Sequence, residues 1–181
     1  LAGLVEKNAI DPAAPNFQLL FMDETSLSLH PPLRRCWMRR AERKQIPAPG
    51  SPAYRHVFGA LNWQSTQVTY LITPAKNSEA FIAFLEHLLF TGYPDEKIIL
   101  VLDNASYHKS RAAMAALDAF AERLRIVWLP TYSPYFNPIE RFWLYLKNWA
   151  SANRLHSSLA DLSAAIEQTI AFHNDLTNSQ R

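Results

Sequence analysis

KIILVLD, Lys97 to Asp103, is the stretch of sequence that decides the fold. Its unbroken apolar run predicts a strand that is buried on both faces, as in parallel sheets covered by helices. The next segment, residues 110–123, has helical spacing, with Met114, Leu117 and Phe120 expected on one face. RIVWLP, residues 125–130, is strand-like again. A strand, a helix and a strand in this order predict two parallel strands joined by a crossover helix.

Upstream of this unit, the sequence predicts strands that are joined more tightly. FQLLFMD, Phe17 to Asp23, is a short apolar run of the kind found in buried strands. YRHVFGALNW and QVTYLIT are strand-like runs joined at Gln64–Thr66, which predicts a hairpin. We also expect residues 34–44 to be able to form a strand.

Three further segments have apolar residues at helical spacing. The first is expected to be capped by Ser78. The periodic positions are Phe81, Phe84, Leu85, Leu88 and Leu89 in the first segment, Ile139, Phe142, Trp143, Leu146 and Trp149 in the second, and Leu159, Leu162, Ile166 and Ile170 in the third. Early hairpin strands followed by strand–helix alternation predict an α/β fold with a mixed sheet, antiparallel over its first three strands and then parallel, flanked by helices.

Composition limits the classes of protein that this chain can belong to. Of its 181 residues 49% are hydrophobic and only four are glycine, which predicts one folded domain rather than a disordered chain. No apolar run is long enough to span a membrane, and a single cysteine, Cys36, excludes an internal disulfide and a cysteine-rich zinc site. We therefore expect a cytoplasmic protein with no membrane partner, associated with the nucleoid if the host is bacterial. Residues 1–15 are interpreted as a linker or the tail of a missing N-terminal region, 16–176 as the domain and 177–181 as a polar tail.

Three acidic residues follow from this arrangement as candidates for catalysis. Asp23 and Asp103 are each expected to end a buried strand, and Glu140 lies in the first turn of a later helix. Strand ends open a crevice in an α/β fold, and if the two strands are neighbours in the sheet, the three carboxylates can converge there. Their mutual repulsion would be removed by two Mg²⁺ or Mn²⁺ ions, which prefer oxygen ligands and support in-line phosphoryl displacement. The sequence therefore predicts cleavage or transfer of phosphodiesters.

The approach to Glu140 is unusually stiff. LPTYSPYFNPIERFW, Leu129 to Trp143, contains three prolines. Asn137 is a candidate N-cap, Pro138 suits the first helical position and Glu140 the third, so that the loop would fix the direction of the carboxylate. Glu140 could also be half of a capping box, with or without a catalytic role.

Several of these segments resemble one known family. FMDET, VLDNASYHKS and LPTYSPYFNPIERFWLYLK are similar to the three catalytic blocks of DDE transposases of the insertion-sequence/mariner superfamily. HPPLRRCWMRRAERKQIPAPGS and VFGALNW are similar to the stretch that follows the first aspartate in that family. The resemblance covers roughly residues 17 to 150, and one departure is Ala41, where a glycine is expected.

This resemblance implies a ribonuclease-H-like fold and a metal-binding triad of Asp23, Asp103 and Glu140. It implies a cut-and-paste transposase domain in which water hydrolyses the phosphodiester at a transposon end and the freed 3′-hydroxyl attacks target DNA. The implied partners are double-stranded DNA, as transposon ends and target, and a second copy of the chain in a homodimeric DNA complex. A module that reads the terminal repeats is expected on a missing N-terminal part.

Other polar residues near the acids could have structural or functional roles. Asp103 and Asn104 could simply form a turn, although Asn104 is also a candidate to support the metal site or to contact the DNA backbone. Of the neighbours Asp23 and Glu24 only one can face the crevice, and Glu24 is interpreted as a structural ion-pair partner. His108, in the family's second block, could support the metal site, contact phosphate or be a plain loop residue.

The Pro-rich block adds residues with the same ambiguity. Tyr132, Asn137 and Ser133 could contact the DNA backbone, although for Tyr132 and Ser133 shaping the turn is favoured. The aromatics of the following helix, Phe142, Trp143 and Trp149, are interpreted as core.

RRCWMRRAERK, Arg34 to Lys44, is the main basic run. Such a run is commonly a solvated face, yet an acidic nuclease site repels DNA, and nearby cations would offset this repulsion. DNA contact is therefore favoured, and arginine suits bidentate recognition of phosphate. The candidate contacts are Arg34, Arg35, Arg39, Arg40, Arg43 and Lys44.

Two other functions are compatible with a domain of this kind. A ribonuclease H or a junction resolvase would share the fold, but the YSPYFNPIE block does not suit them. An inactive or domesticated transposase could serve as a DNA-binding or assembly protein. The acidic triad argues against loss of activity, and Mg²⁺-dependent nicking of DNA would separate the alternatives.

Overall fold

The computed structural model describes residues 17–30, 32–35, 37, 39–42, 45, 52–130 and 137–179. Five strands and a series of helices follow one another in these ranges. In chain order they are β1 (Phe17–Ser28), β2 (Tyr54–Asn62), β3 (Val68–Thr73), α2 (Ser78–His87), the π-helical turn η1 (Leu88–Gly92), β4 (Lys97–Leu102), the 3₁₀ turn η2 (Ser106–Lys109), α3 (Arg111–Ala119), β5 (Leu124–Trp128), α4 (Ile139–Ala150) and α5 (Leu159–Ser179).

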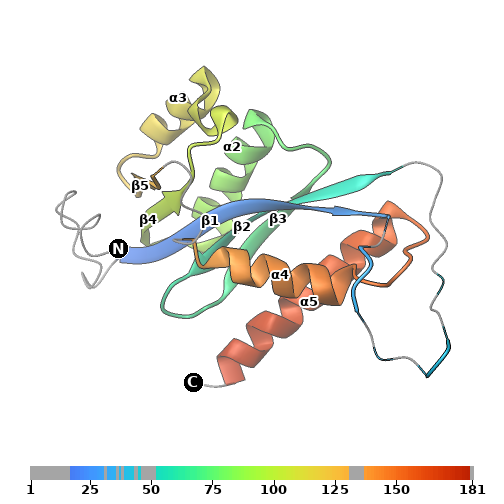
Figure 1. The fold of residues 1–181 in the computed structure, drawn as a ribbon. Coiled ribbons are helices and arrows are strands. Elements are labelled where there is room, and N and C mark those ends of the chain that lie inside the picture. The colour runs from blue at the N-terminus through green and yellow to red at the C-terminus, as the bar shows by residue number, and fades with distance from the viewer. Residues whose placement is uncertain are drawn as a thin grey trace.

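The strands form one mixed sheet in the order β3-β2-β1-β4-β5. β1 is its central strand and the longest, crossing the whole molecule in Figure 1. It pairs antiparallel with β2, which pairs antiparallel with β3, while β4 and β5 join on the other side as parallel strands. This topology confirms the predicted mixed sheet, the hairpin and the parallel crossover.

Helices cover the sheet on both faces. α2 and α3 lie on one face and α4 and α5 on the other, as the green-yellow and orange-red helices of Figure 1 show. Along β1 the even-numbered residues Leu20 and Met22 pack under α2, whereas Leu27 packs under α4 and α5. Successive side chains of β1 therefore point into two different cores. The same alternation places neighbouring polar residues of the strand on opposite faces of the sheet.

β1 is longer than its apolar run predicts. Asp23 does not end the strand, because the strand continues through Glu24 and Thr25 to Ser28. Continued antiparallel pairing with β2 keeps this polar stretch extended, from Asp23↔Gly59 to Ser28↔Tyr54. The expectation that Asp23 is a strand-terminal residue was wrong because backbone pairing, and not side-chain polarity, decides where this strand ends.

The basic run after β1 does not form the strand that was considered for residues 34–44. Its described residues have no strand structure, and Arg43 and Lys44 lie outside the described residues. Ala41 adopts φ 71°, a left-handed conformation that glycine adopts without steric cost. This geometry is a physical reason for the glycine that the family resemblance led us to expect there.

Some local predictions also need correction. Asn77, and not Ser78, caps α2, since its side chain accepts from the backbone N–H of Ala80. Met114 is 39% exposed although Leu117 of the same helix is buried. Trp149 is not core either: 58% of it is exposed, while Phe142 and Trp143 are buried as predicted.

The tail of the chain also differs in form from the interpretation of its sequence. α5 continues through Ser179, so residues 177–179 belong to its last turn. Among the helices that the structure describes, none combines the length and apolar character needed to cross a membrane.

Candidate active site

Asp23 lies where β1 separates from β4. The last residue pair between these two parallel strands is Phe21↔Val101, after which β1 remains paired only with β2. Asp103 follows Leu102, the last residue of β4. The first two predicted acids therefore both lie beside the place where β1 and β4 separate.

α4 carries the third predicted acid. Glu140 lies in the first turn of α4 and is exposed. Asn137 is not the N-cap that was predicted, because Pro138 occupies the cap position with no side-chain hydrogen bond. The buried Asn137 side chain instead donates from Nδ2 to the backbone oxygen of Met22 at 3.0 Å. Asn137 thus joins the start of α4 to β1, one residue before Asp23.

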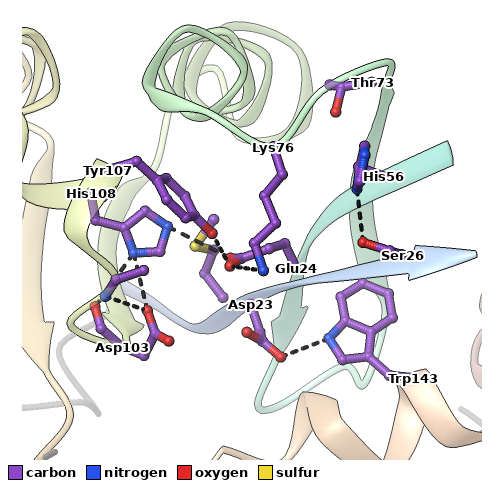
Figure 2. Close-up of polar contacts among 12 residues, drawn as sticks. Asp23, Glu24, Ser26, His56, Thr73, Lys76, Asp103, Tyr107, His108 and Trp143 are labelled. Carbon is purple, nitrogen blue, oxygen red and sulfur yellow. Dashed lines mark hydrogen bonds and ion pairs between the residues drawn. The ribbon is translucent and has the colours of Figure 1, made fainter. Parts of the chain in front are cut away.

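Trp143 makes a second polar link between α4 and β1. Its indole Nε1–H donates to Oδ2 of Asp23 at 2.9 Å, and the indole is only 2% exposed (Figure 2). The ring lies against Gly59, the β2 residue paired with Asp23. A Cβ at Gly59 would lie 2.6 Å from Cη2 of Trp143, so glycine is needed for this close approach.

The Asp23 carboxylate is electrostatically unfavourable as an anion. Burial raises its pKa from the ordinary 3.8 to about 7, and the negative charges of Glu24 and Glu140 act in the same direction. Hydrogen bonds from the Glu24 backbone and from Trp143 lower the pKa, but they only partly offset burial. The influence of Glu140 also indicates that its carboxylate is close enough to interact with Asp23.

Glu24 points to the opposite face of the sheet, where it has several partners (Figure 2). Its Oε1 lies 2.8 Å from Nζ of Lys76 and accepts a hydrogen bond from the Tyr107 hydroxyl. Its Oε2 lies 3.6 Å from Nε2 of His108. The side chain is 3% exposed, which agrees with its interpretation as a structural ion-pair partner rather than a residue of the crevice.

His108 connects Glu24 to Asp103. The histidine is fully buried, with its ring centroid 4.4 Å from Phe81 and 4.5 Å from Tyr107. Its Nδ1 lies 3.1 Å from Oδ1 of Asp103. The hydrogen bond to His108 lowers the pKa of Asp103, and the positive charge of Lys76 acts in the same direction. His108 is therefore not an exposed loop residue, and its position fits support of the second acid.

Asp103 and Asn104 also form the turn that their sequence suggested. Oδ1 of Asp103 accepts from the backbone N–H of Ala105 at 3.0 Å. The amide of Asn104 donates to the backbone oxygen of Leu129 and accepts from Lys109. Asn104 thus joins the β4 end to the β5 end beside the acids.

The remaining predicted DNA contacts are only partly described. Arg34, Arg35, Arg39 and Arg40 are all exposed, as contact with phosphate requires. The segment is attached to the α4–α5 turn, where the Asn153 side chain exchanges two hydrogen bonds of 3.0 Å with the backbone of Arg34. Tyr132 and Ser133 lie outside the described residues.

The chemistry of the acids fits a hard divalent cation, whereas the geometry is not that of a complete metal site. Asp23, Asp103 and Glu140 supply only carboxylate oxygens, and the raised pKa of Asp23 marks a negative charge that a cation would stabilise. In the part of the chain that the structure describes, no group of three or more His, Cys, Asp or Glu residues is arranged to hold one ion. Convergence of all three on shared ions stays a prediction.

Sequence reasoning missed four contributors to this site. Trp143 was interpreted as core only, and its polar link to Asp23 has no sequence signal beyond its place one turn after Glu140. Gly59 did have a signal, because a glycine inside a strand often marks a close approach. Lys76 comes from the β3–α2 loop and Tyr107 from the short turn η2, and the placement of both depends on the tertiary fold.

Comparison with known proteins identifies the family. Residues 18–163 match the family described as DDE superfamily endonuclease. The chain belongs to this family. It is 29% identical over 154 residues to the insertion element IS630 uncharacterized 39 kDa protein of Shigella sonnei, covering 85% of this chain and 45% of that protein. It is 24% identical over 110 residues to the uncharacterized protein y4pE/y4sA of Sinorhizobium fredii (strain NBRC 101917 / NGR234), covering 60% of this chain and 77% of that protein.

Solved structures agree with the DDE fold assignment. A Mos1 transposase paired-end complex with the left transposon end superposes with a TM-score of 0.67 at 16% identity, over 94% of this chain and 52% of that one. The catalytic domain of the Mos1 mariner transposase gives a TM-score of 0.60 at 17% identity, over 84% and 69%. These similarities support the ribonuclease-H-like interpretation of the sheet. The chain spans about half the length of the Shigella protein and of the Mos1 chain.

Proposed function

We propose that this DDE endonuclease chain is the catalytic domain of a DNA transposase that cuts phosphodiesters at transposon ends and transfers the freed 3′-hydroxyl to target DNA. The observation that supports the proposal is the location of Asp23 and Asp103 beside the place where β1 and β4 separate, with Glu140 close enough to raise the pKa of Asp23. The Mos1 neighbours, which include complexes with Mn and with Mg, support it by analogy.

In this proposal Asp23, Asp103 and Glu140 hold Mg²⁺ or Mn²⁺. Two bound cations would supply activation of the attacking oxygen and stabilisation of the leaving oxygen. The protein orients the acids: His108 holds Asp103, Trp143 holds Asp23, and Asn137 ties the start of the Glu140 helix to β1. The exposed arginines beyond β1 attract the DNA backbone, which the negative charges of the three acids would otherwise repel. A homodimer on double-stranded DNA is part of the proposal.

The test is nicking of supercoiled plasmid by the purified chain. Mg²⁺ or Mn²⁺ should support nicking, whereas Ca²⁺, with its looser coordination, should not. Asp103→Asn should reduce nicking to background while retaining DNA affinity, and Asp118→Asn, an exposed acid on α3, should cut like the parent. Full activity in excess chelator, or parental cutting by Asp103→Asn, would refute the proposal. Metal-dependent DNA binding without any cutting would favour the inactive, assembly-type alternative.

The basic segment is tested separately by its salt dependence. Replacing Arg34, Arg35, Arg39 and Arg40 by alanine should weaken DNA binding and reduce the slope of log affinity against log salt by about one for each phosphate that the variant no longer neutralises. Arg125→Ala, exposed on β5, serves as a single-charge control. An unchanged affinity and slope in the fourfold variant would make the run a solvated face.

A further inference from the structure

The link between α4 and β1 has two polar points, and they lie on either side of Glu140 in sequence. Asn137, three residues before Glu140, donates to the backbone oxygen of Met22. Trp143, three residues after it, donates to the carboxylate of Asp23. Both side chains are buried while Glu140 between them is exposed. Two fixed points on consecutive turns determine the position and the rotation of the first turn of a helix relative to a strand.

We propose that Asn137 and Trp143 form a two-point clamp that sets the position of the Glu140 carboxylate relative to that of Asp23. Gly59 leaves the space that the Trp143 ring occupies in this clamp. Asn137 and Trp143 are positioning residues, since they act through the two acids. The inference rests on the proposed function only in assigning metal binding to those acids. The clamp itself is a property of the fold.

Burial gives the clamp its strength. A hydrogen bond to a charged group in a region shielded from water is stronger than its exposed equivalent, and losing the donor leaves the carboxylate less compensated. Replacing Asn137 by an apolar residue would remove the donor that pairs with the Met22 backbone oxygen. The polar contacts therefore add direction to the apolar packing of Ile139, Phe142 and Leu146, which alone would tolerate small shifts of the helix.

The absence of a side chain at Gly59 allows the Trp143 ring to occupy its position against β2. A Cβ at Gly59 would lie 2.6 Å from Cη2 of Trp143 and 3.2 Å from Cζ2, and both atoms belong to the part of the indole that phenylalanine lacks. An alanine at Gly59 must therefore displace the indole although its donor is retained. In a Trp143→Phe background the same alanine has room, so the two substitutions should not be additive.

The decisive experiment measures Mn²⁺ binding by electron paramagnetic resonance, independently of DNA cutting. Trp143→Phe and Gly59→Ala should each weaken Mn²⁺ affinity about tenfold or more, the range found when groups that orient metal ligands are removed. Gly59→Ala added to Trp143→Phe should weaken it no further. Phe142→Leu, a packing change at the adjacent position of α4, should lower thermal stability but keep Mn²⁺ affinity near the parent value.

Nuclear magnetic resonance of the indole N–H groups provides the second measurement. The Trp143 signal, assigned from its absence in Trp143→Phe, should move on Asp23→Asn, and the signal of the exposed Trp149 should not. Parental Mn²⁺ affinity in Trp143→Phe, equal losses in Phe142→Leu, or an unmoved Trp143 signal would overturn the clamp. These outcomes are distinct from failure of the proposed function, which is decided by plasmid nicking in Asp103→Asn.

Discussion

Two neighbouring acids on opposite faces of β1, Glu24 and Asp23, differ in how far their negative charges are compensated. Glu24, under α2, has a lysine at 2.8 Å, a tyrosine hydroxyl and a histidine around it. Asp23, under α4, has the Trp143 indole and a backbone N–H to offset its burial, and its pKa is raised to about 7. A buried acid that the protein has compensated is part of the structure. A half-buried acid without a nearby positive charge among the described residues, such as Asp23, is suited to bind a cation.

The largest expected effect on stability comes from removing the uncompensated charge. In the metal-free protein Asp23 has a folded pKa of about 7 against an ordinary 3.8. The folded state therefore binds more protons than the unfolded state between about pH 4 and pH 7, so its stability falls as pH rises through this window. Asp23→Asn should remove that loss and stabilise the chain at pH 8 by up to about 4 kcal/mol.

Urea unfolding of the parent and Asp23→Asn in chelator, from pH 4 to pH 8, measures this difference. The two free energies of unfolding should be similar near pH 4 and diverge toward pH 8. Parallel curves would mean that Asp23 is compensated after all, and the contrast between the two faces would disappear.

The next effect is of opposite sign and comes from the other face. Glu24→Gln keeps the shape of the side chain but leaves Lys76 and His108 without their anion, and it should destabilise the fold by about 3 kcal/mol at neutral pH. Thermal and urea unfolding at pH 7 provide the measurement, with the exposed Glu122→Gln on the α3–β5 turn as a matched control. A stabilised Glu24→Gln variant would show that both acids of β1 are electrostatically strained.

The smallest effect separates the partners of Glu24. Lys76 has 38% of its side chain exposed, so its ion pair is partly screened by water. Lys76→Met should therefore cost less than about 1 kcal/mol, in the range of surface pairs. The same unfolding measurements test it. A loss as large as that of Glu24→Gln would make the lysine, and not Tyr107 and His108, the main partner of the acid.

The sheet was predictable because its strands carry strong signals. The apolar run at Lys97–Leu102 requires burial on both faces, and the spacing of two β-rich runs around Gln64–Thr66 favours a hairpin. The sequence indicated that Asp23 and Asp103 follow buried strands, but the adjacency of those two strands came from the structure. Burial of apolar runs is a local property of the sequence, so a local pattern could reveal it.

The rest of the site depends on contacts between distant segments. The extension of β1 beyond Asp23 depends on pairing with β2, the burial of His108 on Phe81 and Glu24, and the role of Asn137 on a carbonyl of β1. Trp149 has the spacing of a core residue, but α5 does not cover it and the residue is 58% exposed. Periodicity identifies a candidate face of a helix, whereas the neighbouring element decides how much of that face is buried.

The position of α4 late in the chain has a consequence for synthesis on the ribosome. β1, with Asp23, leaves the ribosome first, and Asp103 follows with β4, but Glu140 and both residues that attach its helix to β1 come last. Segments synthesised first can begin to fold before the chain is complete. A nascent chain that stops before α4 therefore carries Asp23 and Asp103 but lacks both Glu140 and the two residues that attach its helix to β1.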